Sequence, residues 1–475
     1  MRGRFTLICS IVLVLVAAAA LAACGSSSTK ATTASSSTAP SAAPSRPSGG
    51  APEAPPSGSA AQGGAPGGGS STAKYTATGA YTLSGGSATK TGAITAARSD
   101  ESGVLVKSGA LTLKNAKVVT SGASKSSDES SFYGLDAGVL ASGSGKITMT
   151  GGSVTTSGGG ANGIFAYGSS AAIAVSGTTV HASGQYAHGV MASGGGTITA
   201  TNLNVSTSGG SSAPVATDRG GGTIIVKGGT YRSTGNNSPP IYSTGKITAA
   251  KATFTSTGSE AVVIEGSNSV TLSSDTLTTS KAGKWGVMIY QSMSGDAQGG
   301  SGRYTQTGGS LTETAKDSPL FYVTNTNGDI TLKGVKVGAA SGVLVKAAAG
   351  QWGASGSNGG TVILSASAQN LTGDLIADRI SSITVTLKSG SVLKGAVNAN
   401  GAAKSIGLTL DASSSWKVAG SSHLTALTGA TISGSAITNI TGNGHTVTYA
   451  KSAAANSYVG GKTYTLAGGG KLVAK

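Results

Sequence analysis

The sequence predicts an all-β chain that folds as a parallel β-solenoid, or β-helix, over most of its length. Short runs of alternating apolar and small polar residues recur, and Gly, Ser or Asn stands in the gaps between them. Residues 189–210, GVMASGGGTITATNLNVSTSGG, contain three such runs, each typical of a strand of about three residues. With 77 Gly, 11% charged and 4% aromatic residues in 475, the composition suits thin strands stacked in layers that bury only small side chains.

The first strand of each coil recurs at a base interval near 25 residues. The predicted strand starts are Val104, Val139, Ile164, Val190, Val215, Ile241, Val262, Val287, Phe321, Val343 and Leu375. This pattern over about 400 residues resembles the right-handed parallel β-helix of pectate lyases and autotransporter passengers. The resemblance implies three short strands per coil. The later stretch 408–418, LTLDASSSWKV, is similar to the C-terminal coils of adhesin-type passengers.

Residues 1–23 have the layout of an export signal, with Arg2 and Arg4 before an apolar run. The signal ends in Leu-Ala-Ala before Cys24, which resembles the lipobox of bacterial lipoproteins. That resemblance implies a diacylglycerol thioether and a fatty acyl chain such as palmitate on Cys24. Each buried CH₂ of the acyl chains would contribute roughly 0.8 kcal/mol to membrane attachment. We therefore expect a lipid-anchored chain on the outer side of the cell membrane, facing the cell wall or the extracellular space.

The remaining chain divides into a tether and a solenoid. Residues 24–74 are Ser, Ala, Thr, Pro and Gly with almost no large apolar side chains, so they cannot bury a core and are expected to be disordered. Such a segment has a typical end-to-end distance of about 40 Å. Residues 75–475 are the predicted β-helix, with an N-terminal cap at 75–103, regular coils at 104–394, and less regular coils and a cap at 395–475.

Stacked coils place equivalent residues in columns, and alternation along the first strand predicts which columns face outward. The outward column one residue after each strand start is unusually apolar, and aromatic or charged residues occur two positions later. Insertions at 121–134, 291–303 and 346–360 border this face, which is typical of the binding side of a solenoid. We predict a groove whose ligand-binding residues are Phe165, Tyr167, Asp218, Arg219, Tyr242, Glu265, Trp285, Tyr290 and Tyr322. The alternative is that the insertions lie on the apolar strip and bury it.

The best case for catalysis is the carboxylate pair of Asp218 and Glu265, which lie two coils apart in one predicted column. Their Cα atoms are expected about 9–10 Å apart, which is compatible with glycoside hydrolysis, and Arg219 would assist in a lyase. The chain lacks the paired-Asp, Gly-His-Gly and Arg-Ile-Lys signatures of polygalacturonases. His181 and His188 lie on separate turns without a third ligand, so we expect no metal, and no motif indicates a cofactor.

The formal net charge of +16 favours anionic partners such as acidic polysaccharide or cell-wall polymers. The basic residues are scattered singly, which argues against nucleic acid. We expect a monomer that acts as a non-catalytic adhesin or polysaccharide-binding module. The alternatives are a hydrolase or lyase of an acidic glycan, and a structural spacer without a ligand.

Overall fold

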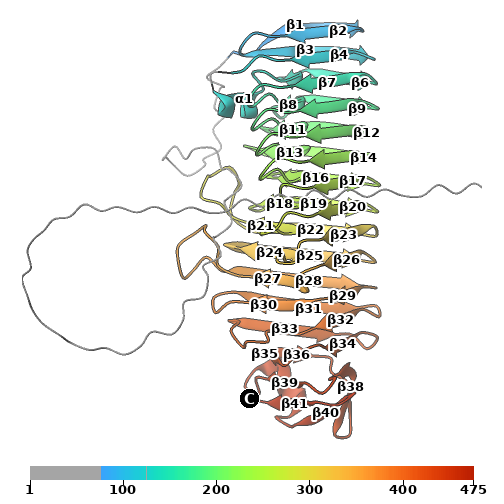
Figure 1. Ribbon diagram of the computed structural model, residues 1–475, viewed down its shortest axis with the longest axis vertical. Coiled ribbons are helices and arrows are strands. Elements are labelled where there is room, and N and C mark those ends of the chain that lie inside the picture. The colour runs from blue at the N-terminus through green and yellow to red at the C-terminus, as the bar shows by residue number, and fades with distance from the viewer. Residues whose placement is uncertain (1–75, 125) are drawn as a thin grey trace, which may run out of the picture. The chain divides into compact units, whose positions relative to one another are not determined.

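The computed structural model describes residues 76–124 and 126–475, and these residues form a nearly all-β parallel β-helix, as the sequence predicts. The coils follow one another from β1 at the top of Figure 1 to β41 at the bottom. The predicted signal at 1–23, Cys24 and the tether at 24–74 lie outside the described residues. Among residues 76–124 and 126–475, no helix is long and apolar enough to cross a membrane.

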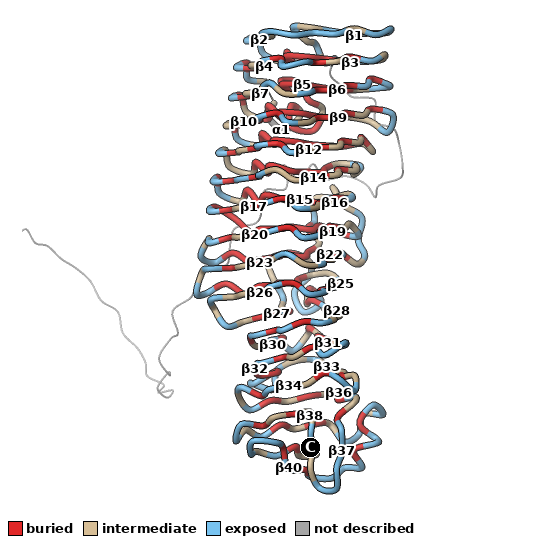
Figure 2. The backbone as a smooth tube through the Cα atoms, turned by 90° about the vertical axis from the view of Figure 1, so that its right-hand side faces the viewer, coloured by how far each residue is buried: buried red, intermediate tan, exposed pale blue. Residues whose placement is uncertain are grey.

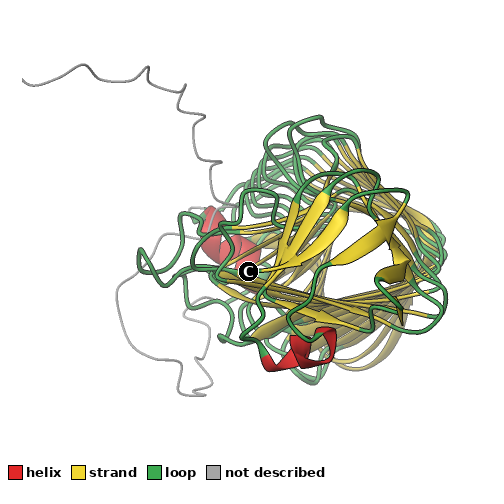
Figure 3. Ribbon diagram, turned by 90° about the horizontal axis from the view of Figure 1, so that it is seen from below, coloured by secondary structure: helices red, strands yellow, loops and turns green. Residues whose placement is uncertain are grey.

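Each regular coil contributes one strand to each of three faces, and strands on a face pair in parallel with the coils before and after. The view along the axis in Figure 3 shows these faces surrounding a central core.

The first face carries the predicted first strands. It contains the start of β3 (Glu101–Lys114), then β5 (Val139–Ser142), β8 (Ile164–Tyr167), β11 (Val190–Ser193), β13 (Val215–Asp218), β15 (Ile241–Ser243), β18 (Val262–Glu265), β21 (Val287–Tyr290), β24 (Phe321–Thr324), β27 (Val343–Ala347) and β30 (Asp374–Ala377).

The second face begins with the later parts of β1 (Thr78–Lys90) and β3. It continues through β6 (Lys146–Thr150), β9 (Ala172–Ser176), the starts of β12 (Gly196–Thr207) and β14 (Gly222–Ser233), β16 (Lys246–Ala250), β19 (Ser269–Ser273), β22 (Ser301–Thr307), β25 (Thr326–Lys333), β28 (Gly360–Ser367), β31 (Ser382–Lys388), β33 (Ser405–Leu410) and β36 (Ala426–Thr428).

The third face completes each coil. It contains β2 (Ala93–Ala96), β4 (Lys117–Thr120), β7 (Ser153–Thr156), β10 (Thr179–Ala182), the ends of β12 and β14, β17 (Thr253–Ser256), β20 (Thr276–Thr279), β23 (Ser310–Glu313), β26 (Lys336–Ala339), β29 (Asn370–Thr372), β32 (Val392–Gly395), β34 (Ser415–Val418) and β38 (Ala436–Thr441).

The register of the first face agrees with the predicted alignment from Val104 to Phe321. Side chains of all three faces alternate between solvent and the interior, where they form one continuous apolar core, visible as the buried stretches of the tube in Figure 2.

Strand β27 begins at Val343, as predicted, but the predicted alignment of Val343 with Phe321 is wrong by two residues. Phe321 pairs with Val345, and a register shift lies between Val343 and Val345. This irregularity lets Leu344 and Val345 both pack in the core. Lys346, rather than Leu344, therefore stands beside Tyr322 in the outward column.

The two ends of the solenoid differ. At the N-terminal end, β1 and β2 pair in parallel with β3 and β4, and β1 has mostly exposed residues. At the C-terminal end, β35 (Ser422–Leu424), β39 (Thr446–Tyr449) and β41 (Lys471–Ala474) stack in parallel. Among the described strands, the antiparallel pairings are those of β37 (Ile432–Ser433) with β38 and of β40 (Tyr464–Ala467) with β41. The 3₁₀ helix η1 (Ala454–Val459) lies at the same end.

Candidate functional site

The candidate site lies on the outside of the first face, along the outward apolar column that we call the outer strip. Its members are Leu105, Leu140, Phe165, Met191, Ala216, Tyr242, Val263, Met288, Tyr322, Lys346 and Ile376. In Figure 1 the helix α1 (Ser127–Tyr133) and the loops that follow β21 and β27 all project on one side of the stack. Two apolar clusters outside the main core show that α1 and the loop after β27 pack on the strip.

Helix α1 covers the N-terminal part of the outer strip. Ser126 caps the helix, since its side chain accepts a hydrogen bond from the Glu129 N–H at 3.3 Å. Gly134 caps the C-terminal end of the helix with a φ of +78°, and a Cβ atom there would lie 2.6 Å from Phe165 Cδ1. Only glycine allows both this backbone conformation and this close approach. Phe132 and Phe165 are consequently buried in one cluster.

The middle of the outer strip is held by a hydrogen-bonded carboxylate, Glu265. The Tyr242 and Tyr290 hydroxyls donate to Glu265 Oε2 at 2.7 and 2.8 Å, and the Ser292 hydroxyl donates to Oε1. Burial and the nearby Glu265 carboxylate raise the pKa of both tyrosines well above the usual range, so both remain protonated donors. Glu265 therefore ties the loop after β21 to the strands beneath it.

Asp218 and Arg219 link the middle of the strip to both neighbouring insertions. Asp218 is buried, and its Oδ1 accepts from the Arg219 N–H at 2.7 Å. Burial, followed by repulsion from Asp296 and Glu265, raises the pKa of Asp218 well above its usual range. The Arg219 side chain lies 3.1 Å from Asp296 Oδ1 and stacks 3.6 Å above the Phe132 ring. Arg219 thus connects α1 to the loop after β21.

Aromatic side chains form the C-terminal part of the strip. The Trp285 and Tyr322 rings are stacked with their centroids 4.2 Å apart. The Trp352 ring packs on the Tyr290 ring, with a centroid separation of 4.7 Å. Asn358 holds the backbone around Trp352, because its Nδ2 donates to the carbonyls of Gly350 and Trp352 at 2.8 and 2.9 Å. The loop of residues 348–359 is thereby closed on itself beside the aromatic stack.

The open groove predicted from the sequence is therefore wrong over most of its length. Phe165, Tyr290, Trp285, Tyr322, Asp218 and Glu265 are buried, whereas Tyr167, Tyr242 and Arg219 are partly exposed. The physical reason is that an outward apolar strip is stabilised by any insertion that removes it from water. The predicted catalytic pair, Asp218 and Glu265, lies under the same cover. The ligand-binding roles assigned to these residues stay predictions.

Acidic and basic side chains are sorted differently by the fold. Among residues whose burial is described, Asp317 is the one exposed acidic residue, whereas every lysine and arginine is exposed except Lys281, Lys284 and Arg219. Several carboxylates accept backbone N–H groups at the corners of coils, at distances of 2.6–2.8 Å for Asp275, Asp374, Asp378 and Asp411. Such charge-assisted hydrogen bonds satisfy turn N–H groups that the sheet leaves unpaired. The surface is consequently more basic than the net charge indicates.

Sequence reasoning missed three residues beside the aromatic stack, namely Asp317, Lys346 and Trp352. Lys346 was missed because the run Val-Leu-Val-Lys-Ala at positions 343–347 fits two registers. Both registers place alternating apolar residues in the core, and the sequence does not distinguish between them. Trp352 and Asp317 lie outside the strands, where no period fixes a position. No group of three or more His, Cys, Asp or Glu residues suited to a metal occurs among residues 76–124 and 126–475.

Comparison with solved structures finds similarity to a chain of the cryo-EM structure of the Vag8–C1 inhibitor complex. The TM-score is 0.44 and the sequence identity 16%, over 79% of this chain and 92% of that chain. No protein-family model matches the sequence, and no curated protein matches it significantly. A likeness at this level carries no argument about function, so the assignment as a parallel β-helix rests on the strand register of the chain itself.

Proposed function

We propose that this protein is a non-catalytic β-helix, lipid-anchored to the cell membrane and facing the extracellular side or the cell wall, that adheres to an anionic polymer. Acidic polysaccharide and anionic cell-wall polymer share the chemistry that it would recognise. The observation that carries the proposal is the sorting of charge, with basic side chains exposed and carboxylates withdrawn into turns and beneath the insertions. A field of one sign over a long surface attracts polymers of the opposite sign.

One pair of lysines illustrates how the surface is prepared for anions. Lys394 on β32 and Lys417 on β34 stand opposite each other in the parallel register, and both are exposed. Like charges directly opposite on neighbouring strands are destabilising. A polyanion that bridges the two ammonium groups removes this repulsion, and we expect such positions to contribute to adhesion.

The lipobox resemblance of the residues before Cys24 supports the anchor. We expect the Cys24→Ser variant, expressed in a bacterium, to lose incorporation of labelled palmitate and to leave the detergent phase on phase separation. Retention of both properties would contradict anchoring through Cys24. This test is independent of the ligand.

Adhesion is tested with the purified full chain on immobilised polygalacturonate, with neutral dextran as the control polymer. We expect binding to polygalacturonate alone, weakened about tenfold or more as the ionic strength rises from about 0.05 to 0.5 M, because salt screens exposed charges. A variant with Lys388, Lys394 and Lys417 all changed to Gln should bind more weakly. The matched variant with Arg at the same positions keeps the charge and should bind like the wild type. Equal binding to dextran, or binding that is insensitive to salt, would refute the proposal.

A further inference from the structure

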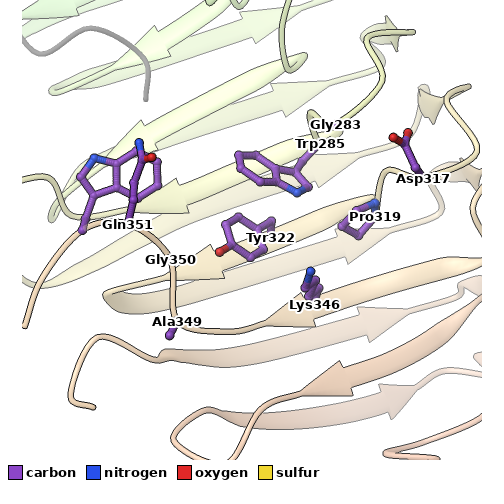
Figure 4. A pocket seen from close by; sticks show the side chains of 10 residues that line it. Gly283, Trp285, Asp317, Pro319, Tyr322, Lys346, Ala349, Gly350 and Gln351 are labelled. Atoms are coloured by element: carbon purple, nitrogen blue, oxygen red, sulfur yellow. The ribbon is translucent and has the colours of Figure 1, made fainter. Parts of the chain in front are cut away.

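A preformed pocket lies beside the aromatic stack at the C-terminal part of the outer strip. Its volume is about 450 Å³, and its lining includes Trp285, Pro319, Tyr322 and Trp352. Figure 4 shows Trp285 beside Tyr322, with Lys346 and Asp317 at the margins of the same space. A pocket of this size with an apolar, aromatic lining and a few polar groups is typical of a small-ligand site.

The walls of the pocket are fixed before any ligand arrives. The Trp285 and Tyr322 rings support each other at 4.2 Å, and the loop wall is held by the two hydrogen bonds from Asn358. Gly350 brings the loop close to the strand, since a Cβ there would lie 3.1 Å from the Tyr322 hydroxyl. A preorganised site loses less conformational entropy when it binds its ligand.

Two exposed charged groups give the pocket its polar chemistry. Lys346 pairs with Tyr322 across neighbouring strands, and its Nζ lies 5.9 Å from the Tyr322 ring centroid. Asp317 is the one exposed carboxylate among the residues whose burial is described, and it lines this pocket. A carboxylate accepts hydrogen bonds from sugar hydroxyls, and an ammonium group pairs with a carboxylate.

A second pocket of about 410 Å³ adjoins the first. The two pockets share Ala349, Gly350 and Gln351, so they lie on either side of this short stretch of loop. The second pocket contains Arg379, whose side chain is exposed. A cationic group therefore follows the aromatic pocket along the outer strip.

We propose that the aromatic pocket binds one pyranose unit of a hexuronate polysaccharide. The apolar face of the sugar lies against the aromatic lining, its hydroxyls donate to Asp317, and its carboxylate pairs with Lys346. The next acidic unit of the chain reaches Arg379. This inference rests on the proposed function, because it takes the anionic polymer to be a glycan.

The chain carries its own reporters for the test. It contains three tryptophans. Trp285 and Trp352 line the pocket, whereas Trp416 is buried in the C-terminal core and donates to the Gly395 carbonyl at 2.9 Å. Digalacturonate and hexagalacturonate, added to the full chain, should change the tryptophan fluorescence, and neutral malto-oligosaccharides of matched length should change it far less. Absence of a change with every oligosaccharide would overturn the site, and equal changes with neutral oligomers would overturn the hexuronate assignment.

Calorimetric titration of variants locates the binding. Trp352→Ala should weaken digalacturonate binding about tenfold or more, and Lys346→Gln about two- to fivefold. Lys336→Gln, an exposed lysine of the third face, is the matched control and should bind like the wild type. Arg379→Gln should weaken binding of both the dimer and the hexamer, because the second acidic unit of either oligomer would reach Arg379. Unchanged dimer affinity in both Trp352→Ala and Lys346→Gln would overturn the pocket.

The two proposals fail in different ways. If the pocket is wrong and adhesion is right, Trp352→Ala keeps its salt-sensitive binding to polygalacturonate and the wild type shows no fluorescence response to digalacturonate. If adhesion through the basic surface is wrong and the pocket is right, the Gln variant of Lys388, Lys394 and Lys417 binds the polymer like the wild type, whereas Trp352→Ala loses it. Lys346→Gln keeps the test valid if Trp352→Ala folds poorly, because Lys346 is exposed.

Discussion

Glu313 should make the protein less stable as the pH rises from mildly acidic to mildly basic. It is fully buried at the end of β23, in an inward column where its neighbours on β20 and β26 are Thr279 and Ala339. Its Oε1 accepts from the Ala315 N–H at 2.8 Å, and its Oε2 has no hydrogen-bond partner. Burial raises its pKa from 4.5 to about 7, with smaller contributions from Asp317 and Glu260.

The direction of this pH dependence follows from whether the folded or the unfolded state binds the proton more tightly. Below about pH 4.5 Glu313 is protonated in both states, and between 4.5 and 7 it is protonated in the folded state alone, so stability falls as the pH rises through this window. Above about pH 7 Glu313 is ionised in both the folded and the unfolded state, and the full destabilisation by its buried charge remains. At roughly 1.4 kcal/mol per pKa unit, the shift corresponds to at most about 3.5 kcal/mol.

The perturbation is Glu313→Gln, which keeps the side-chain shape and the acceptor for Ala315 but cannot ionise. We expect the variant and the wild type to have similar urea midpoints at pH 4.5, and the variant to be more stable by about 1–3 kcal/mol at pH 8. Because coils contact only their neighbours, hydrogen exchange of residues 310–318 should be followed alongside the midpoint. A stability difference that is the same at both pH values would refute a buried, protonated Glu313.

Two further substitutions test the insertions that cover the outer strip. Glu265→Ala leaves the Tyr242 and Tyr290 hydroxyls without their acceptor. We expect the free energy of unfolding, measured in urea, to fall by about 2–6 kcal/mol, and the loop after β21 to be cleaved faster by protease. Unchanged proteolysis would show that Glu265 does not hold this loop. Gly134→Ala places a Cβ 2.6 Å from Phe165 Cδ1 at a φ of +78°. We expect the free energy of unfolding to fall by at least about 1 kcal/mol and hydrogen exchange in α1 to become faster. A variant as stable as the wild type would contradict the close packing.

The sequence alone determined the stacking of the coils. Alternation of period two and a repeat near 25 residues placed Val104, Val139 and Ile164 in one inward column, and the register confirms it. A shift of one coil by one residue against its neighbour would turn its apolar side chains outward, so few alternative registers compete with the observed one. The predicted register failed at Val343. A shift of two residues keeps the alternation of apolar and polar positions, so only the pairing with Phe321 decides between the two registers.

The tertiary structure alone decided what happens on the outside of the first face. The sequence marked the outer strip and the insertions beside it, but an apolar strip is equally consistent with a ligand groove and with a covered packing surface. Contacts between distant residues settle the matter, such as Ser292 with Glu265 and Gly134 with Phe165, because the insertions have no period from which such contacts could be predicted. A pocket at Trp285 and Tyr322 lies beside the loop after β27, whose backbone Asn358 holds through hydrogen bonds to Gly350 and Trp352.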